Sequence, residues 1–254
     1  MIDADLLMGH YPFRPLPHTS SDPQAIKAYL QERGIQRACL ASLHAAFYTD
    51  PEQGNAEVLP LIVQDDFFLP VATINPSLHN WRTTLRRAVD EYGCRNVRLL
   101  PNYHQYPLDA PFVDAFLDAA QTHGLLVTIV KRLEDERMHP PLMKVPGVAN
   151  SDIVALAQRY PQPLLVLSAY FAEIKELAAA TPNLYFDIAF AETLNTLPRL
   201  TETVPPVRLL FGSHSPFFYP EAAIGKIAQW QTSTEIRDAV VRGNLMQLLG
   251  TVER

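Results

Sequence analysis

The chain has 254 residues, 48% of them hydrophobic and 19% charged, which is ordinary for a globular protein able to bury a large core. The net charge of -6 argues against a nucleic-acid partner, because phosphate recognition needs concentrated Lys and Arg. The acidic start is unlike a signal peptide, and no run approaches the roughly 18 apolar residues of a membrane span. We therefore expect a cytoplasmic protein with no membrane segment. Cys39 and Cys94, the only cysteines, lie in separate apolar stretches and are predicted to be buried thiols.

Eight short apolar runs alternate with segments of helical periodicity. The runs predicted as strands are 2–7, 35–41, 68–74, 96–100, 125–130, 163–167, 184–188 and 207–211. The predicted helices are about 22–34, 52–64, 81–93, 109–124, 152–159, 171–180 and 192–203, and helical periodicity then continues to the C-terminus. Asp22 or Ser21 is placed to cap the first of these helices, and Asp109 the fourth.

This alternation predicts the fold. Continuous apolar strands are typical of a parallel sheet buried on both faces, and eight strand–helix units suit a (β/α)8 TIM barrel. A doubly wound open sheet is the competing architecture, but no Gly-rich phosphate loop follows the first strand. We therefore predict an α/β chain with a single TIM-barrel domain over residues 1–254.

In a TIM barrel the active site lies at the carboxyl ends of the strands, so polar residues in and after the apolar runs are the candidate functional residues. They are Asp3, Asp5, Arg14, Arg98, Tyr103, His104, Glu134, Arg137, Asp187 and His214. The aspartates are the most informative of them, because an acid inside an apolar strand must be paired, hydrated or metal-bound. His44 and His139 are interpreted instead as hydrogen-bonded loop residues.

The arginines among these residues admit two roles. Arg14, Arg98 and Arg137 suit bidentate recognition of a substrate carboxylate or phosphate. They are equally suited to neutralise acids of the chain itself, and the run from Glu134 to Arg137 has the composition of a salt-bridge network.

Four short motifs resemble the amidohydrolase-related superfamily, in the branch of metal-dependent TIM-barrel hydrolases similar to aminocarboxymuconate-semialdehyde decarboxylase. Residues 2–9 resemble its first-strand Ile-Asp-x-His-x-His-x-Gly, and residues 98–101 its Lys/Arg-Leu-x-Pro. Residues 209–214 resemble its Leu-x-Phe-Gly-Ser-Asp, and residues 243–249 its closing Gly-Asn-Ala-x-x-Leu-Leu. The similarity extends over essentially the whole chain.

The departures from this pattern fall on the family's metal ligands. Asp5 and Leu7 stand where the family has two first-strand histidines, and Leu cannot bind a metal. Ser168 lies where the sixth strand usually delivers a histidine, and His214 replaces the eighth-strand aspartate. The family's zinc site is therefore not expected intact.

Two chemistries follow from these departures. In the first, one divalent ion (Zn, Mn or Fe) is held by a rearranged set of ligands and activates a water. Its candidate ligands are Asp3, Asp5, His104, Asp187 and His214. In the second, no metal binds, and His214 forms an acid–base pair with Asp5 or Asp187, as in the superfamily's metal-free lactonases.

We therefore predict an enzyme that hydrolyses an ester, lactone or amide, or decarboxylates a related compound, with a small anionic or sugar-like substrate. The predicted catalytic residues are His214, His104, Asp5 and Asp187, and the predicted substrate-binding residues are Arg98, Arg137, Glu134, Tyr103 and Arg14. The alternative is a barrel that has lost catalysis and binds a metabolite or protein partner. A homodimer is expected only because many soluble enzymes form one.

Overall fold

The eight predicted strands are confirmed in the computed structural model, which describes residues 1–140 and 143–250. They pair in parallel in the order β1 to β8. The strands are β1 (Ile2–Met8), β2 (Arg37–Ser42), β3 (Phe68–Thr73), β4 (Asn96–Leu99), β5 (Leu126–Val130), β6 (Leu164–Leu167), β7 (Leu184–Asp187) and β8 (Leu209–Leu210). The amides of Ala4 and Leu7 donate to the carbonyls of Phe211 and Ser215, both at 2.9 Å, which closes the sheet into a (β/α)8 barrel.

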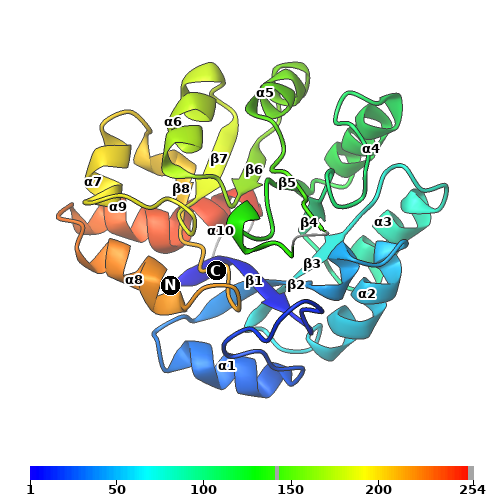
Figure 1. Cartoon of the computed structure of the whole chain (residues 1–254), viewed down its shortest axis with the longest axis horizontal. Helices are drawn as coiled ribbons and strands as arrows, with labels where there is room; N and C mark the ends of the chain where they lie inside the picture. Colours follow the sequence, from blue (N-terminus) through cyan, green and yellow to red (C-terminus); the bar gives the residue numbers. More distant parts are fainter. Residues whose placement is uncertain (141–142, 251–254) are drawn as a thin grey trace.

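Helices surround the barrel (Figure 1). They are α1 (Pro23–Gln31), α2 (Pro51–Val58), α3 (Trp81–Asp90), α4 (Pro111–Thr122), α5 (Asn150–Arg159), α6 (Phe171–Ala180), α7 (Thr196–Thr201), α8 (Pro220–Ala228), α9 (Thr234–Asp238) and α10 (Asn244–Leu248). Short 3-10 turns are η1 (His44–Ala46), η2 (Leu59–Leu61), η3 (Glu136–Met138) and η4 (Pro206–Arg208), and η5 (Ala239–Gly243) is a π-helical turn. Within the described residues, none of these helices is long and apolar enough to cross a membrane.

Two details of the predicted helices are corrected. Asp22 caps α1 as expected, since its side chain accepts the amide of Gln24, but Asp109 caps no helix. Helix α4 begins one position later, because Pro111 occupies its first turn and Ala110 is the capping residue. The helix predicted over 192–203 is shortened to α7, because Asn195 adopts a left-handed φ of 55° and interrupts it.

The core has two apolar shells that follow from the alternation of side chains along each strand. One lies between the barrel and its helices and includes Leu40, Val97 and Phe116. The other fills the barrel interior and includes Val71 and Leu165. Both cysteines are buried and free, as predicted. Because apolar residues fill both shells, the charged side chains of the barrel lie mainly at the carboxyl ends of the strands.

The shortest strand, β8, depends on the C-terminal helical segment. The amide of Phe211, directly after β8, donates to the carbonyl of Val240 at 2.9 Å. Val240 lies in the π-helical turn η5, and such turns leave carbonyl groups free of the regular helical pattern. The side chain of Asn244 in α10 also donates to the carbonyl of Leu209 at 2.8 Å. These two bonds fix the segment that leads to His214.

Candidate active site

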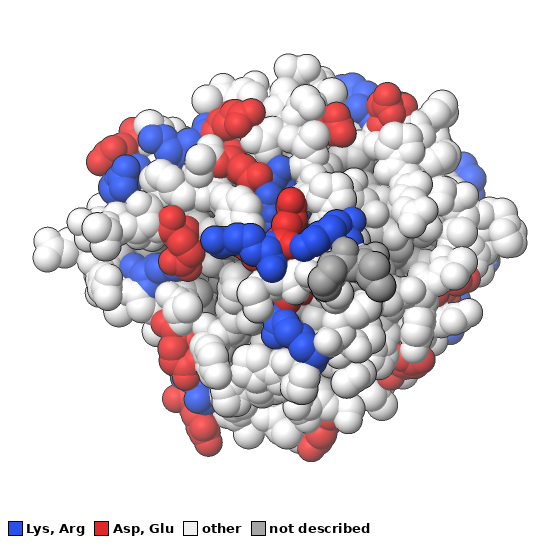
Figure 2. Space-filling model, viewed as in Figure 1, with Lys and Arg blue, Asp and Glu red and all other residues white. Residues whose placement is uncertain are grey.

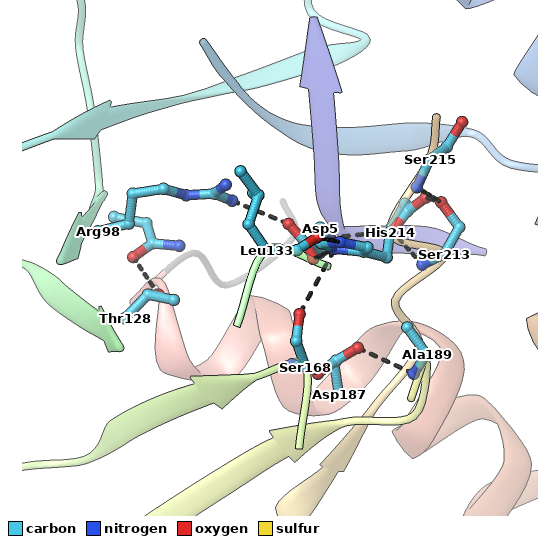
Figure 3. Close-up of polar contacts among 12 residues, drawn as sticks. Asp5, Arg98, Thr128, Leu133, Ser168, Asp187, Ala189, Ser213, His214 and Ser215 are labelled. Carbon is cyan, nitrogen blue, oxygen red and sulfur yellow. Dashed lines mark hydrogen bonds and ion pairs between the residues drawn. The ribbon is translucent and has the colours of Figure 1, made fainter. Parts of the chain in front are cut away.

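The centre of the candidate site is a histidine that β8 and β1 bring against an aspartate. His214 Nδ1 lies 2.5 Å from Asp5 Oδ2, and His214 Nε2 lies 2.7 Å from the carbonyl oxygen of Leu133 (Figure 3). A carbonyl oxygen only accepts, so Nε2 must carry a proton, and an ionised Asp5 favours a proton on Nδ1 as well. The geometry therefore fits a buried imidazolium that donates two hydrogen bonds.

Arg98 completes this network from the opposite side of Asp5 (Figure 3). One of its terminal nitrogens donates to Asp5 Oδ1 at 3.0 Å, and all three side chains are at most 1% exposed as residues. Burial alone would raise the pKa of Asp5, but the charges and hydrogen bonds of His214 and Arg98 lower it. Burial alone would lower the pKa of His214, but Asp5 and the Leu133 carbonyl raise it.

Asp3 lies beneath this network and is held by backbone and hydroxyl groups. Its carboxylate accepts the amide of Ser213 at 2.9 Å, the Ser213 hydroxyl at 2.5 Å and the amide of Asp5 at 3.0 Å. Burial raises the pKa of Asp3 to about 7, despite these three hydrogen bonds. The carboxyl of Asp3 therefore changes its protonation state near neutral pH.

Asp187, at the end of β7, is the third buried carboxyl. It accepts the amides of Ser168 at 2.7 Å and Ala189 at 2.9 Å. Burial and the nearby charge of Asp5 raise its pKa to about 6. Gly212 is required beside it, because a Cβ at this position would lie 2.9 Å from the Asp187 Cβ.

Two residues of the site have unfavourable backbone conformations. Ser168 has a φ of 62° and His214 a φ of 55°, both in the left-handed region that non-glycine residues rarely adopt. The Ser168 hydroxyl lies 3.5 Å from His214 Nδ1, so the two residues meet. Such conformations cost roughly 1–3 kcal/mol each and cluster at functional sites. Their meeting here supports a functional role for the network.

His104, Arg14 and Arg137 lie outside the network. His104 Nε2 is 3.0 Å from the carbonyl oxygen of Ala45, and burial lowers the pKa of this histidine. All three predicted arginines form ion pairs within the chain: Arg98 pairs with Asp5, Arg14 with Glu134 and Arg137 with Asp135. These pairs leave the other expected role, substrate recognition, open for Arg14 and Arg137.

The rearranged metal site is not assembled. Across residues 1–140 and 143–250, no three His, Cys, Asp or Glu side chains are grouped so that they could hold a metal ion. Both oxygens of Asp5 and both ring nitrogens of His214 are already engaged within the protein. The ligand set predicted from Asp3, Asp5, His104, Asp187 and His214 is thus not brought together among the described residues, because Asp5 and His214 bind each other and their neighbours. As these residues are arranged, they do not fit a resident divalent ion.

Aromatic side chains cover His214 at the mouth of the barrel. The ring of Phe217 stacks on the imidazole with a centroid distance of 5.1 Å, and the ring of Tyr11 lies against Phe217 at 5.0 Å. Phe190 and Phe218 approach the imidazole edge to face, at 5.1 and 5.7 Å. In this conformation His214 is closed off from solvent.

A cavity of about 830 Å3 opens beyond Phe190 and Phe218, between segments that follow β5, β6, β7 and β8. Its lining also includes Tyr170, Arg137 and Arg199. The segment after β5 reaches the centre of the face in Figure 1, and basic and acidic side chains lie together there (Figure 2). The cavity lining also contains the carboxylates of Asp135 and Glu192. The cavity therefore combines aromatic rings with both guanidinium and carboxylate groups, which suits a planar polar molecule.

Several of these groups were not predicted from the sequence. The Leu133 carbonyl is a backbone atom, so no residue type signals it. Phe190 and Arg199 lie in segments interpreted only as loop and helix. Ser168 was noted as a departure from the family pattern, and its place after β6 was the available signal.

A parallel (β/α)8 barrel with ionisable groups at the ends of its strands is the arrangement of barrel enzymes. The sequence model of the amidohydrolase family matches residues 44–251, so the chain belongs to this family of enzymes, as its motifs predicted. A search of curated proteins gave no match.

Solved structures of the same fold include several decarboxylases. The 5-carboxyvanillate decarboxylase from Sphingomonas paucimobilis is 12% identical, with 99% of each chain covered and a TM-score of 0.72. A dihydroxybenzoic acid decarboxylase from Polaromonas, with bound manganese and the inhibitor 2-nitroresorcinol, is 15% identical (98% of this chain, 96% of that one, TM-score 0.73). A probable 2-pyrone-4,6-dicarboxylic acid hydrolase from Acinetobacter baumannii, with citric acid bound, is 14% identical (98% of both chains, TM-score 0.69). The manganese agrees with the expectation that a divalent ion is one cofactor of this family.

Proposed function

We propose that this protein is a metal-independent enzyme that decarboxylates a small planar anion bound in the cavity beside Phe190 and Phe218. The observation that carries the proposal is the imidazolium of His214, held by Asp5 and the Leu133 carbonyl directly behind these rings. Both ring nitrogens of His214 face acceptor oxygens, and Asp5 raises the pKa of the imidazole, so this histidine is suited to donate a proton. Decarboxylation needs such a donor, whereas hydrolysis needs a base to activate water.

The proposed reaction consists of carbon–carbon bond cleavage and one proton transfer. The bond between the substrate carbon and its carboxylate breaks, carbon dioxide leaves, and the electron pair stays on carbon. The carbanion takes the Nε2 proton of His214, and the imidazole then recovers a proton from water. Arg137 and Arg199 would hold a negative group of the substrate, and Asp5 keeps the imidazole oriented. Phe190 and Phe218 must rotate for this transfer, because they separate His214 from the cavity.

Three features support this choice of substrate. The cavity presents aromatic rings to a flat molecule, and it holds the guanidinium groups of Arg137 and Arg199 beside the carboxylates of Asp135 and Glu192. The two decarboxylases of the same fold described above act on aromatic acids by name. The pyrone hydrolase makes lactone hydrolysis the alternative reaction on a similar planar acid.

One observation favours a second function, a barrel that binds a metabolite without turning it over. Every hydrogen-bonding atom of the Asp5 carboxylate and the His214 ring has a partner inside the protein. Such satisfied networks also serve to stabilise a fold.

The test uses untagged protein treated with EDTA and a panel of hydroxybenzoates and pyrone carboxylates in D2O. We expect deuterium at the former carboxylate position of the product, detected by NMR, and no change on adding manganese. Arg199→Gln should raise KM, while the matched Arg159→Gln, whose arginine pairs with Asp114 on the outer helices, should not. Binding without turnover would favour the metabolite-binding barrel, and turnover that requires manganese would contradict the proposal.

His214→Ala is a poor test by itself. From the sequence alone, this substitution would be expected to leave the thermal transition nearly unchanged. The structure reverses that expectation, because the side chain is fully buried and makes two hydrogen bonds. Loss of activity in this variant would not separate catalysis from folding.

A further inference from the structure

A second group of residues at the mouth of the barrel surrounds the carboxylate of Glu134. The hydroxyl of Tyr11 donates to Glu134 Oε2 at 2.5 Å, and Arg14 Nε donates to Glu134 Oε1 at 3.1 Å. A second nitrogen of Arg14 also contacts this oxygen. Glu134 is 3% exposed and Tyr11 1%, so the carboxylate is buried where the segments after β1 and β5 meet.

A third donor group lies at the same end of the barrel, in the segment after β4. The ring of Phe47 contacts the rings of both Tyr11 and Tyr103, each at a centroid distance of 5.8 Å. Within the described residues, the buried hydroxyl of Tyr103 has no hydrogen-bond partner. Burial raises the pKa of Tyr103, and the charge of Glu134 raises it further. A buried hydroxyl without a partner costs free energy unless something else binds it.

The guanidinium of Arg14 and the hydroxyls of Tyr11 and Tyr103 form what we call the anion cradle. Charged and neutral donors that converge in this way recognise a carboxylate. Glu134 occupies the cradle as a free carboxylate would. We propose that Glu134 is an internal ligand, and that the carboxylate of an incoming small organic acid displaces it. None of the cradle residues lines the cavity beside Phe190 and Phe218, so the cradle is a second anion site of this barrel mouth. The proposal rests on the function proposed above only for the class of ligand, a small organic acid.

Displacement would also act on His214. Leu133 immediately precedes Glu134, and its carbonyl accepts the Nε2 proton of the imidazolium. Where displacement of Glu134 also shifts the adjoining Leu133 carbonyl, the Nε2 proton is released for transfer. Anion binding and proton donation are then coupled through one peptide unit.

The experiment measures binding of benzoate by calorimetry to the wild-type chain and to Glu134→Gln. We expect the Kd to fall about tenfold in the variant, because a neutral amide competes poorly for Arg14 and leaves more of the chain ready to bind. Glu134→Asp should tighten binding too, since its shorter side chain cannot fill the cradle. Glu136→Gln is the matched control, because the Glu136 carboxylate lies outside the cradle and accepts the Gly147 amide at 2.9 Å. Its Kd should not change.

The outcomes separate the roles of Glu134. An unchanged or higher Kd in both Glu134 variants, with circular dichroism showing that they fold, would overturn the proposal. Arg14→Gln should raise the Kd at least tenfold, and wild-type affinity in this variant would overturn it as well. Tighter benzoate binding by the Glu134 variants, without turnover of any substrate by the wild-type chain, would support the cradle. That result would contradict only the proposed decarboxylase activity.

Discussion

Two aspartate–arginine pairs of this protein have similar nitrogen–oxygen distances and opposite surroundings. Arg98 and Asp5 lie 3.0 Å apart inside the barrel with 2% and 1% of their side chains exposed. Arg137 and Asp135 lie 2.8 Å apart at the rim, where 88% of the arginine side chain is exposed. Solvent screens the rim pair, whereas removing one partner of the inner pair leaves a charge stranded in the core. Distance alone therefore says little about what an ion pair contributes.

The largest effect should come from the inner pair. Asp5→Ala leaves Arg98 and His214 buried without their counter-charge, and we expect the free energy of unfolding to fall by about 3–5 kcal/mol. Urea unfolding followed by circular dichroism measures it. A loss below about 1 kcal/mol would show that water or another group compensates the two cations. The inner and rim ion pairs would then contribute equally little to stability.

The packing around the inner network can be tested without changing a charge. In Gly212→Ala the new methyl group would meet the Asp187 Cβ at 2.9 Å, and we expect a loss of roughly 1–3 kcal/mol. Gly225→Ala in α8 is the control, because nothing lies within 4 Å of its Cβ position. This helical site should gain about 0.5–1 kcal/mol instead. Equal effects of the two substitutions would contradict the close fit at Asp187.

The pH dependence of stability should come from inside the barrel. The pKa of Asp3 is about 7 in the folded chain and 3.8 when unperturbed, so between these values the folded state binds more protons than the unfolded state. Stability must then fall as pH rises through this range. The raised pKa of His214 adds to the fall at higher pH, and the lowered pKa of Asp5 acts only in stronger acid.

Asp3→Asn isolates this contribution, since the amide oxygen still accepts both backbone amides. Thermal unfolding between pH 4 and 7 should show a flatter profile in the variant than in the wild-type chain. The same slope in both proteins would assign the pH dependence to other groups.

The smallest effect on stability is expected at the rim. Arg137→Ala should leave the unfolding midpoint unchanged, because its partner stays hydrated and also accepts the Tyr170 hydroxyl. Substrate affinity should fall, because Arg137 lines the cavity. A lower midpoint would show that the rim pair stabilises the fold, and an unchanged KM would remove Arg137 from the binding site.

The sequence predicts the fold well for a physical reason. Strands buried on both faces are continuous apolar runs, and all eight were recognisable, as was α6 over Phe171–Ala180. An acid within such a run signals a site, and this brought Asp5 to attention. Its partners were not predictable as contacts, because His214 and Arg98 lie 209 and 93 positions away in the sequence. Burial and side-chain direction decide which cation pairs with which acid. Residue types alone do not show whether an arginine binds substrate or neutralises an acid of the chain.

The hydrogen bond from Phe211 to Val240 carries a consequence for the C-terminal end of the chain. The segment bearing His214 is supported by a helical turn that comes some 25 residues later in the sequence. A ribosome must therefore complete nearly the whole polypeptide before the imidazole can settle beside Asp5. Chains shortened ahead of Val240 would carry every ionisable side chain of the network and still lack the support that orients it.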